Sequence, residues 1–207
     1  MLMAPPFVKI CGVTTPEDAA MAAAAGADAI GINLWPGSKR FVPPADAKRV
    51  VAAIPPAVLK VGVFVGASAE DVARRIDELG LDRAQLHGDE TPVAFAAVPG
   101  ARIVRVVRVR DEASFDDEAG WSPALWLYDA FVDGFGGGGV AAPWALIARR
   151  ARRPFLLAGG LTPANVAAAV AATGADGVDV ASGVETRPGV KDPAAVAAFI
   201  AAARGAR

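Results

Sequence analysis

Short apolar runs alternate with Ala-rich segments along the whole chain. Each apolar run is rich in Val, Ile, Leu or Phe and lacks a helical period, which predicts a buried strand. Several of the segments in between begin with Ser, Thr or Asp followed by proline or an acid, which predicts a helix. The predicted strands are 7–11, 29–33, 59–65, 83–86, 102–107, 124–129, 155–158 and 177–181, and the predicted helices begin near residues 16, 44, 69, 92, 112, 143, 163 and 193.

Strict alternation of strand and helix predicts an α/β fold with a parallel sheet. Two units resemble copies of each other, because residues 15–28 and 162–176 both begin with Thr-Pro and end with Gly-Ala-Asp. Eight such units in 207 residues predict a single-domain (β/α)8 TIM barrel over residues 1–207. An open doubly wound sheet is the alternative, but its first strand is usually followed by a glycine-rich fingerprint, which is missing at 11–14.

Composition and charge argue against nucleic-acid and membrane partners. The formal net charge is −1 and the charges are mixed, so neither a nucleic-acid surface nor a charged tail is expected. The single cysteine excludes an internal disulfide and fits a reducing compartment. The chain has no apolar run of bilayer length, and residues 1–6 lack the features of a signal peptide. We expect a soluble cytoplasmic protein without a membrane partner.

Polar residues near the C-terminal ends of the strands are the candidate site, because TIM barrels carry their active sites there. We keep the strand residues whose side chains can point into the barrel when side chains alternate along the strand, and the polar loop residues that follow. They are Lys9, Cys11, Asn33, Ser38, Lys39, Arg40, Gln85, His87, Arg105, Asp129, Asp179 and Ser182.

The first and last strands are neighbours in a closed barrel, so Lys9 and Asp179 are expected to form an ion pair. A structural role explains this pair without any catalysis. The cation beside Cys11 is expected to favour the thiolate, although a lone cysteine is also compatible with a small buried hydrophobe. A buried carboxyl at Asp129 is costly unless it has a function, and burial near Asp179 is expected to raise its pKa.

The remaining candidates allow two interpretations each. Arg40 is either a surface residue or a planar group that grips a carboxylate at two points. His87 is explained equally well by a backbone contact, and Gln85 by a partner in the core. Glycine turns follow the last two strands, where barrels often bind phosphate through backbone N–H groups. The residues of these turns are Gly159, Gly160, Ser182 and Gly183.

Five segments together resemble the phosphoribosylanthranilate isomerase family of tryptophan biosynthesis. They are Lys-Ile-Cys-Gly at 9–12, Pro-Gly-Ser-Lys-Arg at 36–40, Gln-Leu-His-Gly at 85–88, Leu-Ala-Gly-Gly-Leu at 157–161 and Val-Asp-Val-Ala-Ser-Gly-Val-Glu at 178–185. The resemblance implies a cofactor-free and metal-free Amadori rearrangement of N-(5-phosphoribosyl)anthranilate to 1-(2-carboxyphenylamino)-1-deoxyribulose 5-phosphate. It implies a phosphosugar as the small-molecule partner, and we expect a monomer or a homodimer.

The family's motifs also imply roles for individual residues. Asp129 matches the general acid that opens the sugar ring, and Cys11 matches the base that removes the C2 proton. Arg40 matches the group that binds the anthranilate carboxylate. The turns at Gly159-Gly160 and Ser182-Gly183 match the phosphate site, and Asp179 is expected to contact the substrate as well.

The sequence departs from the family pattern in two places. Ala181 stands where serine is common, and the glycine run 136–139 lacks the usual Ser or Thr and the Asp-Trp that follows it. The glycine-rich loop 132–139 is expected to be mobile or to wrap around a ligand. Two other functions remain open: the histidine-pathway isomerase, which uses an aspartate on its first strand, and a non-catalytic phosphosugar-binding barrel.

Overall fold

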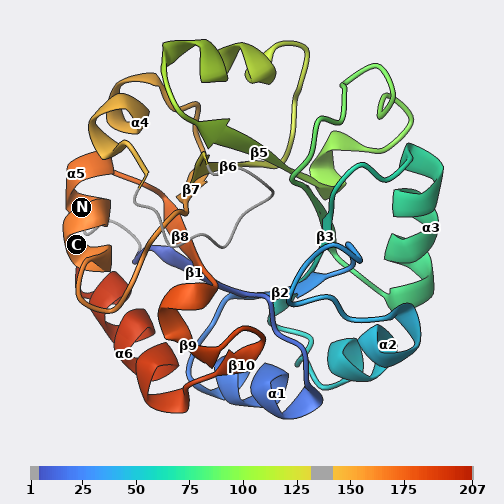
Figure 1. Ribbon diagram of the computed structural model, residues 1–207, viewed down its shortest axis with the longest axis vertical. Helices are drawn as coiled ribbons and strands as arrows, with labels where there is room; N and C mark the ends of the chain where they lie inside the picture. Colours follow the sequence, from blue (N-terminus) through green and yellow to red (C-terminus); the bar gives the residue numbers. More distant parts are fainter. Residues whose placement is uncertain (1–4, 132–141, 207) are drawn as a thin grey trace.

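The computed structural model describes residues 5–131 and 142–206. Eight parallel strands form a closed barrel in the order β1 to β8, which confirms the predicted TIM barrel and excludes the open sheet (Figure 1). The strands are β1 Phe7–Cys11, β2 Ala29–Asn33, β3 Leu59–Phe64, β4 Arg83–Leu86, β5 Ile103–Val109, β6 Leu125–Ala130, β7 Phe155–Leu157 and β8 Gly177–Val180.

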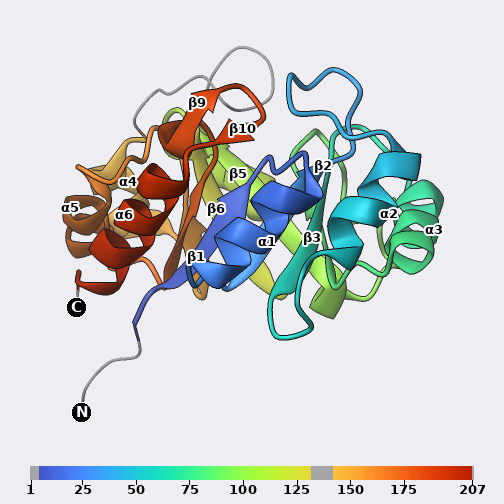
Figure 2. The same cartoon turned by 90° about the horizontal axis from the view of Figure 1, so that it is seen from below.

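Helices surround the barrel and cover its outer face (Figures 1 and 2). They are α1 Pro16–Ala24, α2 Pro44–Ala52, α3 Ala69–Leu79, α4 Trp144–Arg150, α5 Val166–Thr173 and α6 Pro193–Arg204, together with the short 3-10 helices η1 Gly100–Arg102, η2 Glu112–Glu118 and η3 Ser182–Val184. Among the described residues, none of these helices has both the length and the apolar character needed to cross a membrane.

Three helix predictions were wrong in detail. The segment after residue 92 forms turns, because Pro92 and Pro99 leave too short a stretch between them for a helix to propagate. The segment near 112 is the 3-10 helix η2, whose Asp and Ser residues favour turns over α-helix. The third, α5, begins at Val166 rather than near 163. Asn165 is its N-cap, but the Asn165 side chain accepts the N–H of Thr162 at 2.7 Å and makes no capping bond to the helix.

A small antiparallel hairpin after β8 was not predicted. It consists of β9 Glu185–Arg187 and β10 Val190–Lys191, with Gly189 at a φ of +83° in the turn. Figure 2 shows it at the end of the barrel where β1 and β8 finish.

Side chains of the strands alternate between the barrel interior and the layer under the helices. The interior holds a small apolar cluster of Val104, Val106, Leu127, Leu156 and Ala158, and the larger core lies outside the barrel. Because Val104 and Val106 point inward, Arg105 points outward, and its predicted inward direction was wrong. Both faces of a buried parallel strand are apolar, so the pattern alone did not identify the inner face.

Outward-facing Arg105 is held by groups of the segment that follows β4. Its Nη1 donates to the carbonyls of Gly88 and Leu86 and to Glu90 Oε2 at 3.0, 3.3 and 3.2 Å, and its guanidinium lies 5.1 Å from the centre of the Trp121 ring. Arg105 therefore secures the segment 86–90, which leads out of β4.

Aspartates tie neighbouring strands together at the N-terminal end of the barrel. Asp28 donates its N–H to the carbonyl of Val8 and accepts the N–H of Val8 on its side chain, at 2.9 and 2.8 Å. Asp176 makes the same pair of bonds with Phe155, which explains why the two copied units end alike. Asp82 repeats the arrangement with Lys60, at 2.9 and 2.8 Å.

Replacing one of these carboxylates should weaken the barrel measurably. We expect Asp82→Ala to lower the free energy of unfolding by about 1–3 kcal/mol, because it leaves the Lys60 N–H without its charged acceptor. Asp82→Asn keeps an acceptor and should lose less. Asp77→Ala, which removes a carboxylate that is 75% exposed, should lose less than about 1 kcal/mol. Urea unfolding midpoints test this ranking, and equal losses for Asp82→Ala and Asp77→Ala would contradict it.

Candidate active site

The candidate site lies at the C-terminal end of the barrel, where strand ends bring distant parts of the chain together. Lys9 and Cys11 on β1, Gln85 on β4, Asp129 on β6 and Asp179 on β8 share the inward-facing register. His87 follows β4 directly and is buried with them.

Lys9 and Asp179 form the expected ion pair inside the barrel. They are direct partners in the β1–β8 register, and Lys9 Nζ lies 2.8 Å from Asp179 Oδ1. Lys9 is 1% exposed. Burial acts to lower the pKa of Lys9, but Asp179 and Cys11 outweigh it and raise that pKa, so the ammonium stays charged. Asp179 Oδ2 has no hydrogen-bond partner among the described residues and is available to a ligand.

Cys11 occupies space that a glycine leaves open. A Cβ on Gly31, its register partner on β2, would lie 2.7 Å from the Cys11 sulfur and 3.1 Å from Lys9 Nζ. Burial raises the pKa of the Cys11 thiol and Lys9 lowers it, and the net shift is upward. Lys9 therefore favours the thiolate as expected, but burial favours the neutral thiol more strongly.

Asp129 is held at the end of β6 by the N–H of the next residue, and a glycine turn lies against it. Its Oδ1 accepts the N–H of Ala130 at 2.8 Å, and a Cβ on Gly159 would come within 3.1 Å of the same oxygen. Burial, and then the negative charge of Asp179, raise the pKa of Asp129 to about 7. The direction agrees with the sequence-based expectation. A carboxyl of this kind is partly protonated near neutral pH.

His87 faces Asp129 as a neutral imidazole. Gln85 Nε2 lies 3.2 Å from His87 Nδ1. With the Gln85 amide in this orientation its nitrogen donates to Nδ1, which assigns the ring proton of the neutral imidazole to Nε2. That Nε2 is 3.5 Å from Asp129 Oδ2 and has no closer partner. Burial and then Arg108 lower the pKa of His87 to about 3. His87 can therefore contribute a neutral N–H to the Asp129 carboxyl.

Arg40 reaches the site across the loop between β2 and α2. Its side chain crosses the end of β1 so closely that a Cβ on Gly12 would lie 2.3 Å from Arg40 Cδ. Ser38 Oγ accepts the Arg40 N–H and so shapes the loop, whereas Lys39 is exposed. Asn33 Oδ1 is occupied by the N–H of Trp35. Arg40 is therefore the side chain of this loop placed beside Cys11, and its guanidinium pairs with Glu185.

The two glycine turns after β7 and β8 pack against each other. Gly159 and Gly160 have φ of +88° and +64°, which side chains rarely adopt. A Cβ on Gly183 would meet the carbonyl oxygen of Leu161 at 1.9 Å, so only glycine permits this contact. The N–H groups of Gly160, Ser182 and Gly183 donate to no other residue in the described ranges. The turns thus bring several N–H donors to one place.

Sequence reasoning missed four residues that shape this site. Gly31 lies inside a predicted strand, and a glycine there could have indicated that another group approaches the strand backbone closely. Arg108 lies on the inward face of β5, two residues beyond Val106, and its charge lowers the pKa of both His87 and Asp129. Glu185 and Lys191 come from the unpredicted hairpin. The glycine-rich loop 132–139 lies outside the described residues.

The chain is similar over nearly its whole length to one family. The profile of N-(5'phosphoribosyl)anthranilate (PRA) isomerase matches residues 8–202. The N-(5'-phosphoribosyl)anthranilate isomerase of Neisseria meningitidis serogroup B is 46% identical over 198 residues, which cover 94% of this chain and 95% of that protein.

Solved structures agree with this similarity. Phosphoribosyl anthranilate isomerase from Thermotoga maritima superposes with a TM-score of 0.89 at 35% identity, covering 97% of this chain and 99% of that one. A phosphoribosyl anthranilate isomerase in complex with reduced 1-(o-carboxyphenylamino)-1-deoxyribulose 5-phosphate superposes with a TM-score of 0.84 at 34% identity, again covering 97% and 99%.

The raised pKa of Asp129 makes a prediction about stability. Between pH ~4, where an aspartate ordinarily titrates, and about 7, the folded state keeps a proton that the unfolded state has lost. Stability conferred by this proton is therefore lost as the pH rises. Relative to Asp129→Asn, we expect the free energy of unfolding of the wild type to fall by up to about 1.4 kcal/mol per pH unit across this window. Denaturant unfolding of both proteins measures the difference, and a difference independent of pH would contradict the assignment.

Proposed function

Because the chain belongs to the N-(5'-phosphoribosyl)anthranilate isomerase family, we propose that it isomerises N-(5-phosphoribosyl)anthranilate to 1-(2-carboxyphenylamino)-1-deoxyribulose 5-phosphate in tryptophan biosynthesis. One observation carries the assignment of the chemistry. Asp129 is a carboxyl whose pKa is about 7, and it lies at the mouth of the barrel with a thiol on β1 facing the same space. A group that titrates near the working pH is the most effective general acid.

Asp129 is the proposed acid of the first step. It donates its proton to the furanose ring oxygen as the bond from C1 to that oxygen breaks, and the lone pair of the anthranilate nitrogen forms the iminium. The N–H of Ala130 and the neutral His87 near the two carboxyl oxygens hold the group in place as it becomes an anion.

Cys11 is the proposed base of the second step. Its thiolate removes the proton from C2 of the iminium, which yields the enolamine that becomes the ketose. Lys9 lies close enough to lower the pKa of Cys11 and stabilises the thiolate that the step requires. Both steps are proton transfers, so neither requires a metal or an organic cofactor.

The ends of the substrate fit the remaining groups. Arg40 is the proposed partner of the anthranilate carboxylate, because a guanidinium can bind it at two points. The N–H groups at Gly159-Gly160 and Ser182-Gly183 are the proposed phosphate site. The free oxygen of Asp179 is the proposed acceptor for a sugar hydroxyl.

Of the two alternative functions, the non-catalytic barrel is favoured by one feature of the sequence, the altered glycine run at 136–139. The histidine-pathway reaction requires an aspartate where this chain has Cys11, and a binding barrel does not require the paired acid and base. A cytoplasmic location, the absence of a nucleic-acid partner, and a monomeric or homodimeric state remain predictions from the sequence.

Removing either proton-transfer group should abolish turnover. We expect Asp129→Asn and Cys11→Ser each to lower kcat at least about 100-fold, because an amide cannot donate the proton and a hydroxyl is a weak base. Product binding should be retained, since phosphate and carboxylate contacts are untouched. Anthranilate fluorescence follows turnover and circular dichroism checks the fold. More than about a tenth of wild-type kcat in a folded variant would remove that residue from the mechanism.

The pH profile should reveal the order of the two titrations. The active form needs Asp129 protonated and Cys11 ionised, whereas the free protein has the pKa of Asp129 at about 7 and that of Cys11 raised. The reaction therefore proceeds through the minor protonation state. kcat/KM should rise with pH until Asp129 titrates near pH 7 and then stay constant. It should fall only where Cys11 titrates, which is above pH ~8.5, the ordinary pKa of a thiol.

Direct titration assigns the two breaks in this profile. The single cysteine makes thiolate absorbance specific for Cys11, and carbon NMR reports Asp129. The acidic break should match the Asp129 titration rather than the phosphate pKa of about 6. A thiolate already formed at pH 7 would contradict this order.

A further inference from the structure

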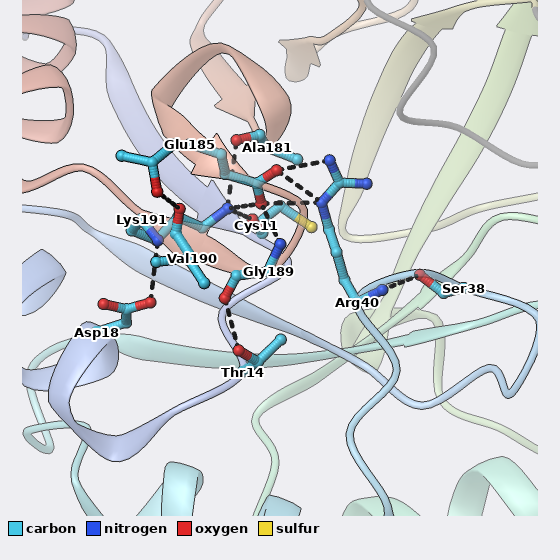
Figure 3. Close-up of polar contacts among 11 residues, drawn as sticks. Cys11, Thr14, Asp18, Ser38, Arg40, Ala181, Glu185, Gly189, Val190 and Lys191 are labelled. Atoms are coloured by element: carbon cyan, nitrogen blue, oxygen red, sulfur yellow. Dashed lines mark hydrogen bonds and ion pairs between the residues drawn. The ribbon is translucent and has the colours of Figure 1, made fainter.

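Four donors surround the carboxylate of Glu185 on β9 (Figure 3). Arg40 donates from Nε at 2.9 Å to Oε1 and from Nη2 at 2.6 Å to Oε2. Lys191 Nζ donates to Oε1 at 2.6 Å and the N–H of Gly189 donates to Oε1 at 3.3 Å. The Glu185 side chain is 3% exposed. Burial acts to raise the pKa of Glu185, but the bonds from Arg40 and Lys191 outweigh it, so the group is an anion.

The hairpin that carries Glu185 is fixed to the end of β1. Lys191 Nζ donates to the carbonyl of Cys11 at 2.6 Å and to that of Ala181 at 3.3 Å. Thr14 Oγ1 donates to the carbonyl of Gly189 at 2.6 Å, and the N–H of Lys191 donates to Asp18 Oδ2 at 3.1 Å. Glu185 therefore has a fixed position relative to Cys11.

Glu185 occupies one edge of the Arg40 guanidinium and leaves the other open. A guanidinium has five N–H donors, and the Nε–Nη2 edge is used by Glu185. Nη1 has no partner among the described residues, and Figure 3 shows the third nitrogen pointing away from Glu185. The Nη1–Nη2 edge is thus free for a second carboxylate.

The charges of this group explain why Glu185 does not cancel Arg40. Arg40 and Glu185 alone are a neutral pair, which has little attraction for an anion. Lys191, whose side chain is 0% exposed, contacts the same carboxylate at 2.6 Å. Burial lowers the pKa of Lys191 overall, although Glu185 acts to raise it, and the ammonium held by Glu185 brings the sum to one positive charge. One positive charge complements the single negative charge of a carboxylate.

Resting on the function proposed above, we propose that Glu185 is a positioning residue. It aims the free edge of Arg40 at the anthranilate carboxylate, and Lys191 restores the positive charge that Glu185 removes. The opposite hypothesis is that Glu185 competes with the substrate for Arg40. The two hypotheses predict KM changes of opposite sign when Glu185 loses its charge.

The test is Glu185→Gln, assayed with N-(5-phosphoribosyl)anthranilate and with the same adduct made from aniline, which lacks the carboxylate. We expect KM for the anthranilate adduct to rise about 10-fold or more while kcat stays within about twofold, because the lost contact orients a ground-state interaction. KM for the aniline adduct should not change. The matched control Glu17→Gln removes the same charge from an exposed site and should leave both values unchanged.

A double-mutant cycle tests whether Glu185 acts through Arg40. In an Arg40→Ala background, Glu185→Gln should have no further effect on KM. If Glu185→Gln does not fold, Arg40→Lys replaces it, because one ammonium cannot hold two carboxylates at two edges; its KM should rise at least about 10-fold.

The outcomes separate this inference from the proposed function. An unchanged or lower KM in Glu185→Gln, an equal rise with the aniline adduct, or a wild-type KM in Arg40→Lys would overturn the positioning role while leaving the isomerase activity intact. Failure of the wild-type protein to convert the anthranilate adduct would overturn the function itself.

Discussion

The ion pair between Lys9 and Asp179 connects the architecture of the barrel to its chemistry. It joins the first strand to the last one at the point where the barrel closes. It also lies among the proposed catalytic groups, where Lys9 lowers the pKa of Cys11 and Asp179 raises that of Asp129. Each charge also acts on the other group in the opposite sense, since Asp179 raises the pKa of Cys11 and Lys9 lowers that of Asp129. The pair therefore couples the two titrations to each other. Removing one partner would leave a buried charge unpaired, which typically costs about 3–5 kcal/mol, and would disturb both titrations at once.

Charges around this pair are balanced in the interior and positive at the rim. Lys9 and Asp179 cancel, Asp129 is partly protonated near neutral pH, and His87 is neutral because burial and Arg108 oppose its protonation. The group of Arg40, Glu185 and Lys191 keeps one positive charge. Arg108, on the inward face of β5, is paired with the exposed Asp89 at 2.9 Å. This distribution suits a substrate that is anionic at both ends and reacts in the middle. A neutral interior lets protons move between substrate and protein without a large fixed charge opposing either direction.

The sequence predicted the barrel because each strand carries its own local signal, a short β-branched run followed by a cap. It predicted the pairing of Lys9 with Asp179 because barrel closure fixes which strands are neighbours. It did not predict the direction of Arg105, since both faces of β5 are apolar. Alternation shows which residues share a face of the strand, but not which of the two faces points into the barrel. It did not predict the Arg40–Glu185 contact either, because 145 residues separate the partners and no local pattern encodes their meeting. The hairpin that makes this contact is too short to show a strand period, although Pro188-Gly189 marked its turn.

Glycine explains why the reactive side chains can be buried so closely together. Gly31 leaves room for the Cys11 sulfur and for Lys9 Nζ, Gly12 for the Arg40 side chain, and Gly159 for the Asp129 carboxyl. In each case an added Cβ would lie 3.1 Å or closer to the functional group, below ordinary van der Waals contact. Gly31 has no turn to make and weakens the strand that contains it. Its presence is accounted for by the Cys11 sulfur and the Lys9 ammonium that it faces rather than by its own backbone.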